Sequence, residues 1–375
     1  MGRPTVAEID LGALRYNFSQ IRALAGSHRE ILAVVKADAY GHGAGPVARE
    51  LQSAGAGLFG VATVEEGVDL RRGGVTLPVL ILTGISPADL RKVTANNLTP
   101  VITDLESARA LDSKAAKMGK TLSVHLKVDT GLSRLGIPFR DWGVVFEELR
   151  SLNHLRIEGL MSHLAAPESE REEDKSFTGE QIRRFQECLE HGCRAGLRPR
   201  YIHLAGSGAM ATRNESCFNL VRPGLMLYGL HPSPALRSRI SLRPVLSWKT
   251  TVLSLKRVCE GDTVSYGRTH YCRRESLIAT LPVGYADGYS RGLSNKGEVL
   301  VRGKRAKVVG RVCMDLTMVD VSGIPGVKAR DEVILLGKQG DEEISASEMA
   351  GWLGTISYEV LCAIGKRVPR VYKQG

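Results

Sequence analysis

The chain has 375 residues, of which 43% are apolar and 24% are charged, and its formal net charge is +11. A chain of this length is longer than most that fold around a single hydrophobic core, so we expect an ordinary globular protein with two domains. Because its apolar stretches are short and its basic residues are dispersed in pairs, we expect neither a membrane nor a nucleic-acid partner, and predict a cytoplasmic protein that attracts small anions.

Short apolar runs alternate with helical periodicity from residue 10 to about residue 230. In the first predicted helix Asp10 is the candidate N-cap, apolar residues share one face, and Gly26 ends the helix. Eight strand and helix units in about 220 residues predict an α/β fold, a (β/α)8 TIM barrel, because a doubly wound sheet usually has fewer strands. The eight predicted strands are 31–35, 57–62, 79–82, 99–102, 122–128, 157–162, 199–203 and 218–222.

The pattern changes after Pro232 and Pro234. Strand-like runs separated by turn residues follow from about residue 240, and a short helix is expected at 358–364. We therefore predict a cofactor-binding barrel domain over 1–235 and a C-terminal, mainly β domain over 236–375, with residues 1–10 a candidate strand for pairing with the second domain. The seven cysteines include no Cys-x-x-Cys pair, so we expect thiols and no metal site.

Lys36 stands where an apolar strand ends and a glycine-rich turn begins. The apolar run 31–35 precedes it, and Ala-Asp-Ala-Tyr-Gly-His-Gly follows at 37–43. Such a position desolvates the lysine stem, and burial lowers the pKa of an amine, as Schiff-base chemistry with an aldehyde cofactor requires. The alternative is a lysine that ends a strand by reaching solvent.

Other polar side chains follow the ends of the predicted strands, where the chemistry of a (β/α)8 barrel takes place. Each of these residues alone could have an ordinary structural role, such as that of a hydrogen-bonded core histidine or a surface arginine. Because they all stand at corresponding positions after the strand ends, we favour a shared functional site. In strand order the candidates are Lys36, Tyr40, Arg134, His163, His203, Ser207, Arg222 and Gly224.

Six motifs resemble, in order, those of the alanine racemase family. Segment 35–43 looks like the attachment motif for pyridoxal 5′-phosphate. The resemblance implies that this cofactor is used to interconvert L-alanine and D-alanine, which supplies D-alanine for cell-wall peptidoglycan. It also implies an eight-stranded barrel with a β domain, in a homodimer with composite active sites. The other five motifs lie at 127–136, 221–229, 264–267, 282–288 and 310–315.

The resemblance also assigns the cofactor-binding residues. Lys36 would attach the cofactor, and Arg222 would face its pyridine nitrogen, which then stays unprotonated because a guanidinium only donates hydrogen bonds. Glycine-flanked backbone amides would approach the phosphate closely. The implied set is Lys36, Tyr40, His203, Ser207, Arg222, Gly224, Leu225 and Tyr358.

Racemisation needs a base on each face of the substrate Cα. By the resemblance, Lys36 serves one face and Tyr266 the other. Since a phenol with a pKa near 10 is a poor base at neutral pH, His163, itself tied to Arg222, would stabilise the phenolate.

The resemblance places the substrate carboxylate on Arg134 and on the backbone at Met314. Tyr285 and Tyr358 would narrow the entrance. Lys127 resembles a position that becomes a carbamate and gives Arg134 an anionic partner. An ordinary ion pair of Lys127 with a nearby aspartate is the alternative.

The alternative hypotheses include two other kinds of enzyme and two kinds of binding protein. One is a racemase for a larger amino acid; another is a decarboxylase of a similar barrel family, although it would need an acidic partner where Arg222 stands. A binding protein that only carries the cofactor would leave the β domain and Tyr266 without a role. Nucleotide binding through 41–45 is disfavoured, because the spacing is G-x-G-x-G and not G-x-G-x-x-G.

Overall fold

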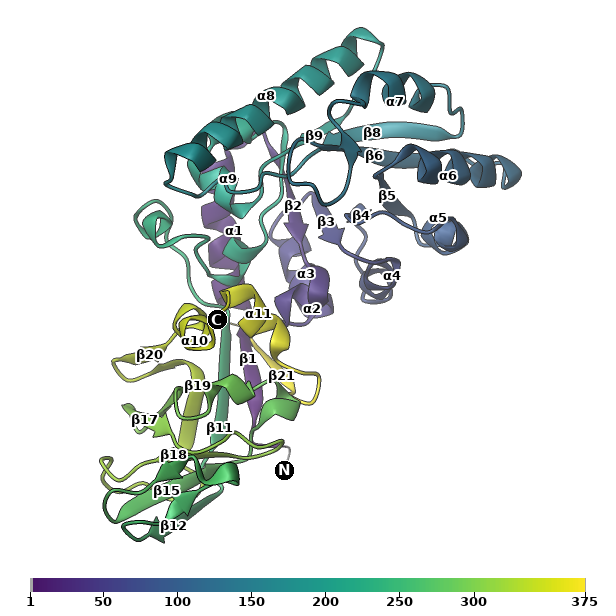
Figure 1. The fold of residues 1–375 in the computed structure, drawn as a ribbon. Helices are drawn as coiled ribbons and strands as arrows, with labels where there is room; N and C mark the ends of the chain where they lie inside the picture. The colour runs from purple at the N-terminus through teal and green to yellow at the C-terminus, as the bar shows by residue number, and fades with distance from the viewer. Residues whose placement is uncertain (1–2, 375) are drawn as a thin grey trace. The chain divides into compact units, whose positions relative to one another are not determined.

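The computed structural model describes residues 3–374. They divide into two compact units, which are treated separately (Figure 1). The barrel unit consists of residues 14–39 and 44–243, and the β unit of residues 3–13, 40–43 and 244–374. None of the helices in this described part of the chain is both long and apolar enough to cross a membrane.

The barrel unit contains eight parallel strands, which confirms the predicted (β/α)8 fold. Their order is β10-β2-β3-β4-β5-β6-β8-β9, and a parallel bridge between Gly206 and Arg222 brings the two end strands together. Each predicted strand overlaps an observed one. The strands are β2 Glu30–Val34, β3 Leu58–Val61, β4 Val79–Ile81, β5 Leu98–Ile102, β6 Leu122–Asp129, β8 Leu155–Met161, β9 Tyr201–His203 and β10 Leu220–Val221.

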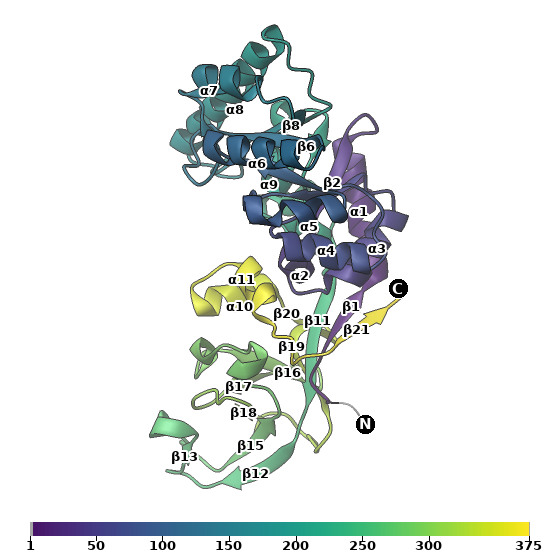
Figure 2. The same ribbon diagram turned by 90° about the vertical axis from the view of Figure 1, so that its right-hand side faces the viewer.

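Helices surround these strands (Figures 1 and 2). Several begin at side-chain caps: Thr63 and Glu66 form a capping box, and Asp104 accepts a hydrogen bond from the Ser107 amide. The helices are α1 Leu11–Ala25, α3 Ala44–Ser53, α4 Val64–Arg72, α5 Leu90–Ala95, α6 Leu105–Lys117, α7 Trp142–Leu149, α8 Glu172–Arg194 and α9 Ser207–Thr212. Strand β2 is buried along Ile31–Val34, as expected for a parallel strand covered on both faces.

The β unit is built on a ten-stranded sheet with the main order β12-β15-β18-β17-β16-β19-β11-β1-β21. Strand β1, Val6–Asp10, lies antiparallel to β11 and parallel to β21. Helices α10, Ala346–Leu353, and α11, Ser357–Ala363, complete the unit. The other strands are β11 Leu246–Thr251, β12 Ser254–Val258, β13 Thr263–Val264, β14 His270–Tyr271, β15 Ser276–Leu281, β16 Glu298–Val301, β17 Lys304–Val308, β18 Thr317–Asp320, β19 Glu332–Gln339, β20 Glu342–Ile344 and β21 Arg370–Lys373.

Candidate active site

Lys36 opens a left-handed helical turn, α2, Lys36–Tyr40. The next four residues, 37–40, have φ between 51° and 54° although none is glycine. Left-handed backbone costs an L-residue roughly 1–2 kcal/mol, so surrounding contacts must hold it. The Ala37 amide donates to Glu66 Oε1 at 2.6 Å, and Asp38 Oδ1 accepts from the Ala44 amide at 2.7 Å. Strained backbone that is held by its surroundings often lies at functional sites, and this turn begins at the candidate lysine.

The end of β2 is fixed against the segment that follows β10. The Val34 amide donates to the Pro223 carbonyl at 3.0 Å, and the Tyr228 hydroxyl donates to the Val34 carbonyl at 3.0 Å. Gly224 donates its amide to Ser207 Oγ at 2.9 Å. Ser207 begins α9, so a hydroxyl and short-helix backbone amides lie together near the strand that leads into Lys36, which is a suitable environment for a phosphate group.

Arg222 is buried and makes five hydrogen bonds through its two terminal nitrogens. Nη1 donates to His203 Nδ1 at 3.1 Å and to the His203 carbonyl at 2.8 Å. Nη2 donates to the Ser162 and Leu204 carbonyls and to His163 Nδ1, at 2.7, 3.0 and 3.0 Å. Within the described chain its Nε–H has no acceptor, so this donor is available to a ligand. An unprotonated pyridine nitrogen is an acceptor of that kind.

The guanidinium also determines which histidine nitrogens carry protons. Burial, followed by the charge of Arg222, lowers the pKa of His163 to about 3 and that of His203 well below its ordinary value, so both rings are neutral. Since Nδ1 of each ring accepts from Arg222, Nε2 must carry the proton. His163 therefore offers an Nε2–H donor.

His203 in turn determines which nitrogen of a third histidine ring carries the proton. Its Nε2 lies 2.8 Å from Nδ1 of His125, a residue of β6 that is 1% exposed. Because His203 Nε2–H donates, His125 accepts at Nδ1 and carries its proton on Nε2. Our sequence analysis missed His125. The available signal was its spacing of two from Lys127, which places both side chains on one face of a strand.

Lys127 and Arg134 add positive charge near Arg222. Burial and the charges of Arg134, Arg222 and Lys36 lower the pKa of Lys127 to about 8, while Asp129 acts in the opposite direction. Asp129 Oδ1 accepts from the amides of Gly131 and Ser133. No carboxylate of residues 3–374 lies within ion-pair distance of Lys127, Arg134 or Arg222. The cluster is therefore suited to anionic groups.

Three motif loops of the β unit contact one another. The Tyr285 amide donates to the Cys313 carbonyl at 3.0 Å, and Ser265 Oγ donates to the Arg311 carbonyl at 2.6 Å. These contacts bring together loops 264–267, 282–288 and 310–315. Their large side chains are exposed: Tyr266 by 73%, Met314 by 53% and Tyr285 by 42%. Exposed large apolar groups on adjoining loops mark an interaction surface.

Tyr40 and Tyr358 pack together elsewhere in the β unit, with ring centroids 5.8 Å apart. Burial, then the neighbouring Tyr358 and Cys362, raises the pKa of Tyr40, so its hydroxyl stays protonated and can donate a hydrogen bond.

The predicted site residues thus fall into two groups. Lys36, Lys127, Arg134, His163, His203, Ser207, Arg222, Gly224 and Leu225 follow or occupy the carboxyl ends of the barrel strands, and Tyr40, Tyr266, Tyr285, Met314 and Tyr358 belong to the β unit.

Comparisons with known proteins cover the whole chain. Residues 9–232 match the family model "Alanine racemase, N-terminal domain", and residues 245–372 match "Alanine racemase, C-terminal domain". Alanine racemases from Geobacter sulfurreducens and Halothermothrix orenii are each 46% identical over 371 residues, 99% of this chain and 97% of theirs.

Solved structures agree. Alanine racemase from Clostridium difficile 630 superposes with a TM-score of 0.94 at 35% identity, over 100% of this chain and 97% of that one. Alanine racemase from Bartonella henselae, solved with covalently bound pyridoxal phosphate, gives 0.87 at 29% identity, over 99% and 100%. This chain belongs to the alanine racemase family.

Proposed function

We propose that this protein interconverts L-alanine and D-alanine by two-base proton transfer at Cα, with pyridoxal 5′-phosphate as cofactor and D-alanine for peptidoglycan as its product. The observation that carries the proposal is Arg222: all its terminal N–H groups are used within the barrel, while Nε–H has no acceptor among residues 3–374. The relatives named alanine racemase support it.

The residues fit the cofactor. Lys36 would attach it through its amine, Ser207 with the backbone of Gly224 and Leu225 would hold the phosphate, and Arg222 Nε–H would donate to the pyridine nitrogen. When bound, the cofactor withdraws electrons from the substrate Cα–H bond. A guanidinium only donates hydrogen bonds, so Arg222 cannot accept one from a protonated ring nitrogen. The nitrogen therefore stays unprotonated, and the cofactor withdraws electrons only moderately. We infer that the site favours simple removal and return of a proton. Tyr40, His203 and Tyr358 would complete the cofactor site.

Lys36 and Tyr266 are the proposed bases. Lys36 moves the proton on one face of Cα, and Tyr266 moves it on the other. Arg222 fixes the proton of His163 on Nε2, and this N–H would donate to the Tyr266 oxygen and lower the free energy of the phenolate. The substrate carboxylate would accept hydrogen bonds from Arg134 and from the backbone at Met314, and Tyr285 and Tyr358 would limit the entrance.

A homodimer with composite sites follows from this assignment. We propose that Tyr266, Tyr285 and Met314 reach the barrel of a second subunit. Their exposure supports the idea, because an exposed tyrosine base needs a covering partner before water is excluded from the reaction.

We further propose that Lys127 becomes a carbamate. A pKa of about 8 leaves part of the amine neutral and nucleophilic near physiological pH. The neutral amine would add to the carbon of dissolved carbon dioxide and release one proton to solvent, and the resulting carbamate anion would pair with Arg134. The absence of an ion pair at Lys127 within the described residues favours this over the aspartate alternative.

A chiral assay tests the function. Purified protein is incubated separately with L-alanine, L-serine and larger L-amino acids, and D-enantiomers are measured by chiral chromatography. We expect D-alanine to form fastest. Failure to form any D-amino acid with cofactor present would overturn the proposal, and a preference for a larger amino acid would correct the substrate.

A further inference from the structure

The barrel unit has a cavity at the end opposite Lys36. Its volume is about 210 Å³, and it is lined where strands begin: Leu58 opens β3, Val79 opens β4 and Tyr201 opens β9. Lys36 and Arg222 instead follow the carboxyl ends of their strands. This volume is many times the roughly 10–15 Å³ that one water needs, so a small organic molecule fits. The cavity is separate from the proposed active site.

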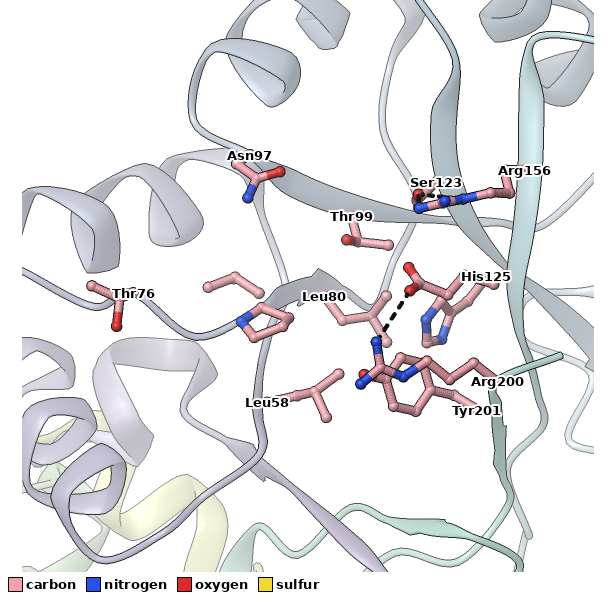
Figure 3. Close-up of a pocket in the computed structure, with 13 residues that line it drawn as sticks. Leu58, Thr76, Leu80, Asn97, Thr99, Ser123, His125, Arg156, Arg200 and Tyr201 are labelled. Atoms are coloured by element: carbon pink, nitrogen blue, oxygen red, sulfur yellow. Dashed lines mark hydrogen bonds and ion pairs between the residues drawn. The ribbon is translucent and has the colours of Figure 1, made fainter.

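The lining has an apolar side and a polar side (Figure 3). Four apolar residues from the starts of β3 and β4 form the first: Leu58, Pro78, Val79 and Leu80. Polar residues from β5, β6 and β8 form the second: the hydroxyls of Thr99 and Ser123, the neutral ring of His125 and the cationic Arg156. A ligand that matches both sides has a short hydrocarbon part and a compact polar group.

His125 supplies a directed donor to this cavity. Its ring is buried and lines the cavity, and its Nδ1 is occupied by His203. The tautomer imposed by Arg222 leaves Nε2–H as a donor, and no acceptor for it lies within hydrogen-bond distance in residues 3–374. Gly159 makes room for the ring, since a Cβ at that position would overlap it. An N–H that lines a cavity and has no acceptor in the described chain can donate to a ligand that carries an acceptor.

Arg156 is the cationic group of the lining that a ligand anion would contact. Arg156 donates from Nε and Nη2 to Ser123 Oγ at 3.2 and 2.6 Å, and no carboxylate of the described chain lies within ion-pair distance of it. Glu158, the carboxylate in the lining, lies 4.0 Å from Arg200, which also stacks on the Tyr201 ring. Arg200 also lies 4.0 Å from Glu30, so this arginine is shared between two carboxylates. Arg156 is exposed and has no carboxylate within ion-pair distance in the described chain, so it is the arginine available to a ligand anion.

We propose that this cavity binds a short aliphatic carboxylate. The carboxylate accepts hydrogen bonds from His125 Nε2–H and from Arg156, and the alkyl group packs against Leu58 and Leu80. Inorganic oxyanions match only the polar side, so they should bind more weakly. The ligand would be the last acceptor of a hydrogen-bonded series that runs from Arg222 through His203 and His125, and its charge should polarise each of those bonds.

Histidine nitrogen resonances test the proposal site by site. The cofactor-loaded protein is prepared with ¹⁵N-labelled histidine and titrated with isobutyrate. We expect the His125 Nε2 resonance to move and saturate, with a smaller movement at His203. The proposed substrate is also a carboxylate, so isobutyrate could bind in the active site and shift the His163 resonance. The titration is therefore repeated in Arg134→Gln, which should remove any shift at His163 and leave the shift at His125.

Two arginine variants complete the test. Arg156→Gln should weaken isobutyrate binding at His125 at least about tenfold, a loss of about 1.4 kcal/mol. Arg194→Gln is the matched control, because this arginine is 73% exposed on α8 and does not line the cavity, and it should bind as the unmodified protein does. The proposal is overturned by a His125 resonance that does not respond, by an equal response to phosphate or chloride, or by unchanged affinity in Arg156→Gln. None of these outcomes depends on whether the protein racemises alanine.

Discussion

Arg222 sets the protonation of three histidines through hydrogen bonds. It donates to His163 and His203 at Nδ1, and His203 in turn donates to His125. Burial, and next the nearby Arg134, lowers the pKa of Arg222 to about 9, which still leaves it charged at neutral pH. One buried charge therefore orients donors toward both ends of the barrel.

Replacing Arg222 with glutamate should change which reaction occurs. A carboxylate lets the pyridine nitrogen hold a proton, which strengthens electron withdrawal. We expect Arg222→Glu to slow racemisation about 10²-fold and to raise transamination, measured as pyruvate formed per D-alanine formed. Arg222→Lys is the control, because it keeps a donor and should not raise that ratio. An unchanged ratio in the glutamate variant would mean that Arg222 does not face the ring.

Lys36→Ala should abolish racemisation in both directions, because it removes the attachment point and one base together. Borohydride reduction followed by peptide mass spectrometry should find the cofactor on Lys36 in the unmodified protein and nowhere in the variant. The control is Lys92→Ala, an exposed lysine of the barrel unit paired with Glu65. Near-normal activity of Lys36→Ala with both enantiomers would contradict the assignment.

Lys127 should show pH-dependent carbamate formation. Its pKa, lowered to about 8, makes the neutral amine predominate above that pH, so the carbamate should increase as pH rises through about 8. The measurement is ¹³C NMR of protein equilibrated with ¹³C-bicarbonate. Lys127→Arg keeps the positive charge and should lack the signal; persistence of the signal in that variant would place it elsewhere.

At the scale of elements, the left-handed turn after β2 is the least ordinary feature. A substitution to glycine usually lowers the free energy of unfolding, because it increases the entropy of the unfolded state. At φ near +51°, however, it also removes a steric cost of roughly 1–2 kcal/mol from the folded state. We expect Ala37→Gly to leave the free energy of unfolding unchanged or to raise it by up to about 1 kcal/mol.

The same substitution in an ordinary helix gives the opposite sign. Ala110 is an exposed residue in the interior of α6, and Ala110→Gly should cost about 1 kcal/mol. Urea titrations of both variants under identical conditions compare them. A loss at Ala37 as large as that at Ala110 would show that the left-handed turn stores no strain.

Much of the element pattern could be predicted from the sequence. The eight barrel strands appear as apolar runs at regular spacing, and Asp10 caps the first helix by accepting from the Ala13 amide at 2.8 Å. The turn at 37–40 could not be predicted, because nothing in Ala-Asp-Ala-Tyr signals positive φ. His125 was missed for a different reason: its partner His203 is distant in sequence, and the contact exists only once β6, β8 and β9 lie side by side.

At the scale of the whole molecule, the site residues are shared between two units. The barrel unit holds Lys36 and the Arg222 network, while Tyr266 lies on an exposed loop of the β unit. Sequence motifs predicted both groups, but motifs do not show which subunit a residue serves. The central claim is that two bases from different subunits act on one substrate.

Mixing two inactive variants tests that claim most directly. Lys36→Ala and Tyr266→Ala subunits are co-refolded with cofactor, heterodimer formation is verified by mass spectrometry, and racemisation of alanine is measured. With composite sites, each heterodimer has one site with both bases and one with neither. Random pairing makes about half the dimers mixed, so about a quarter of normal activity should return. If verified heterodimers remain as inactive as the two parent variants, Tyr266 does not act on the barrel of a partner subunit and the account is contradicted.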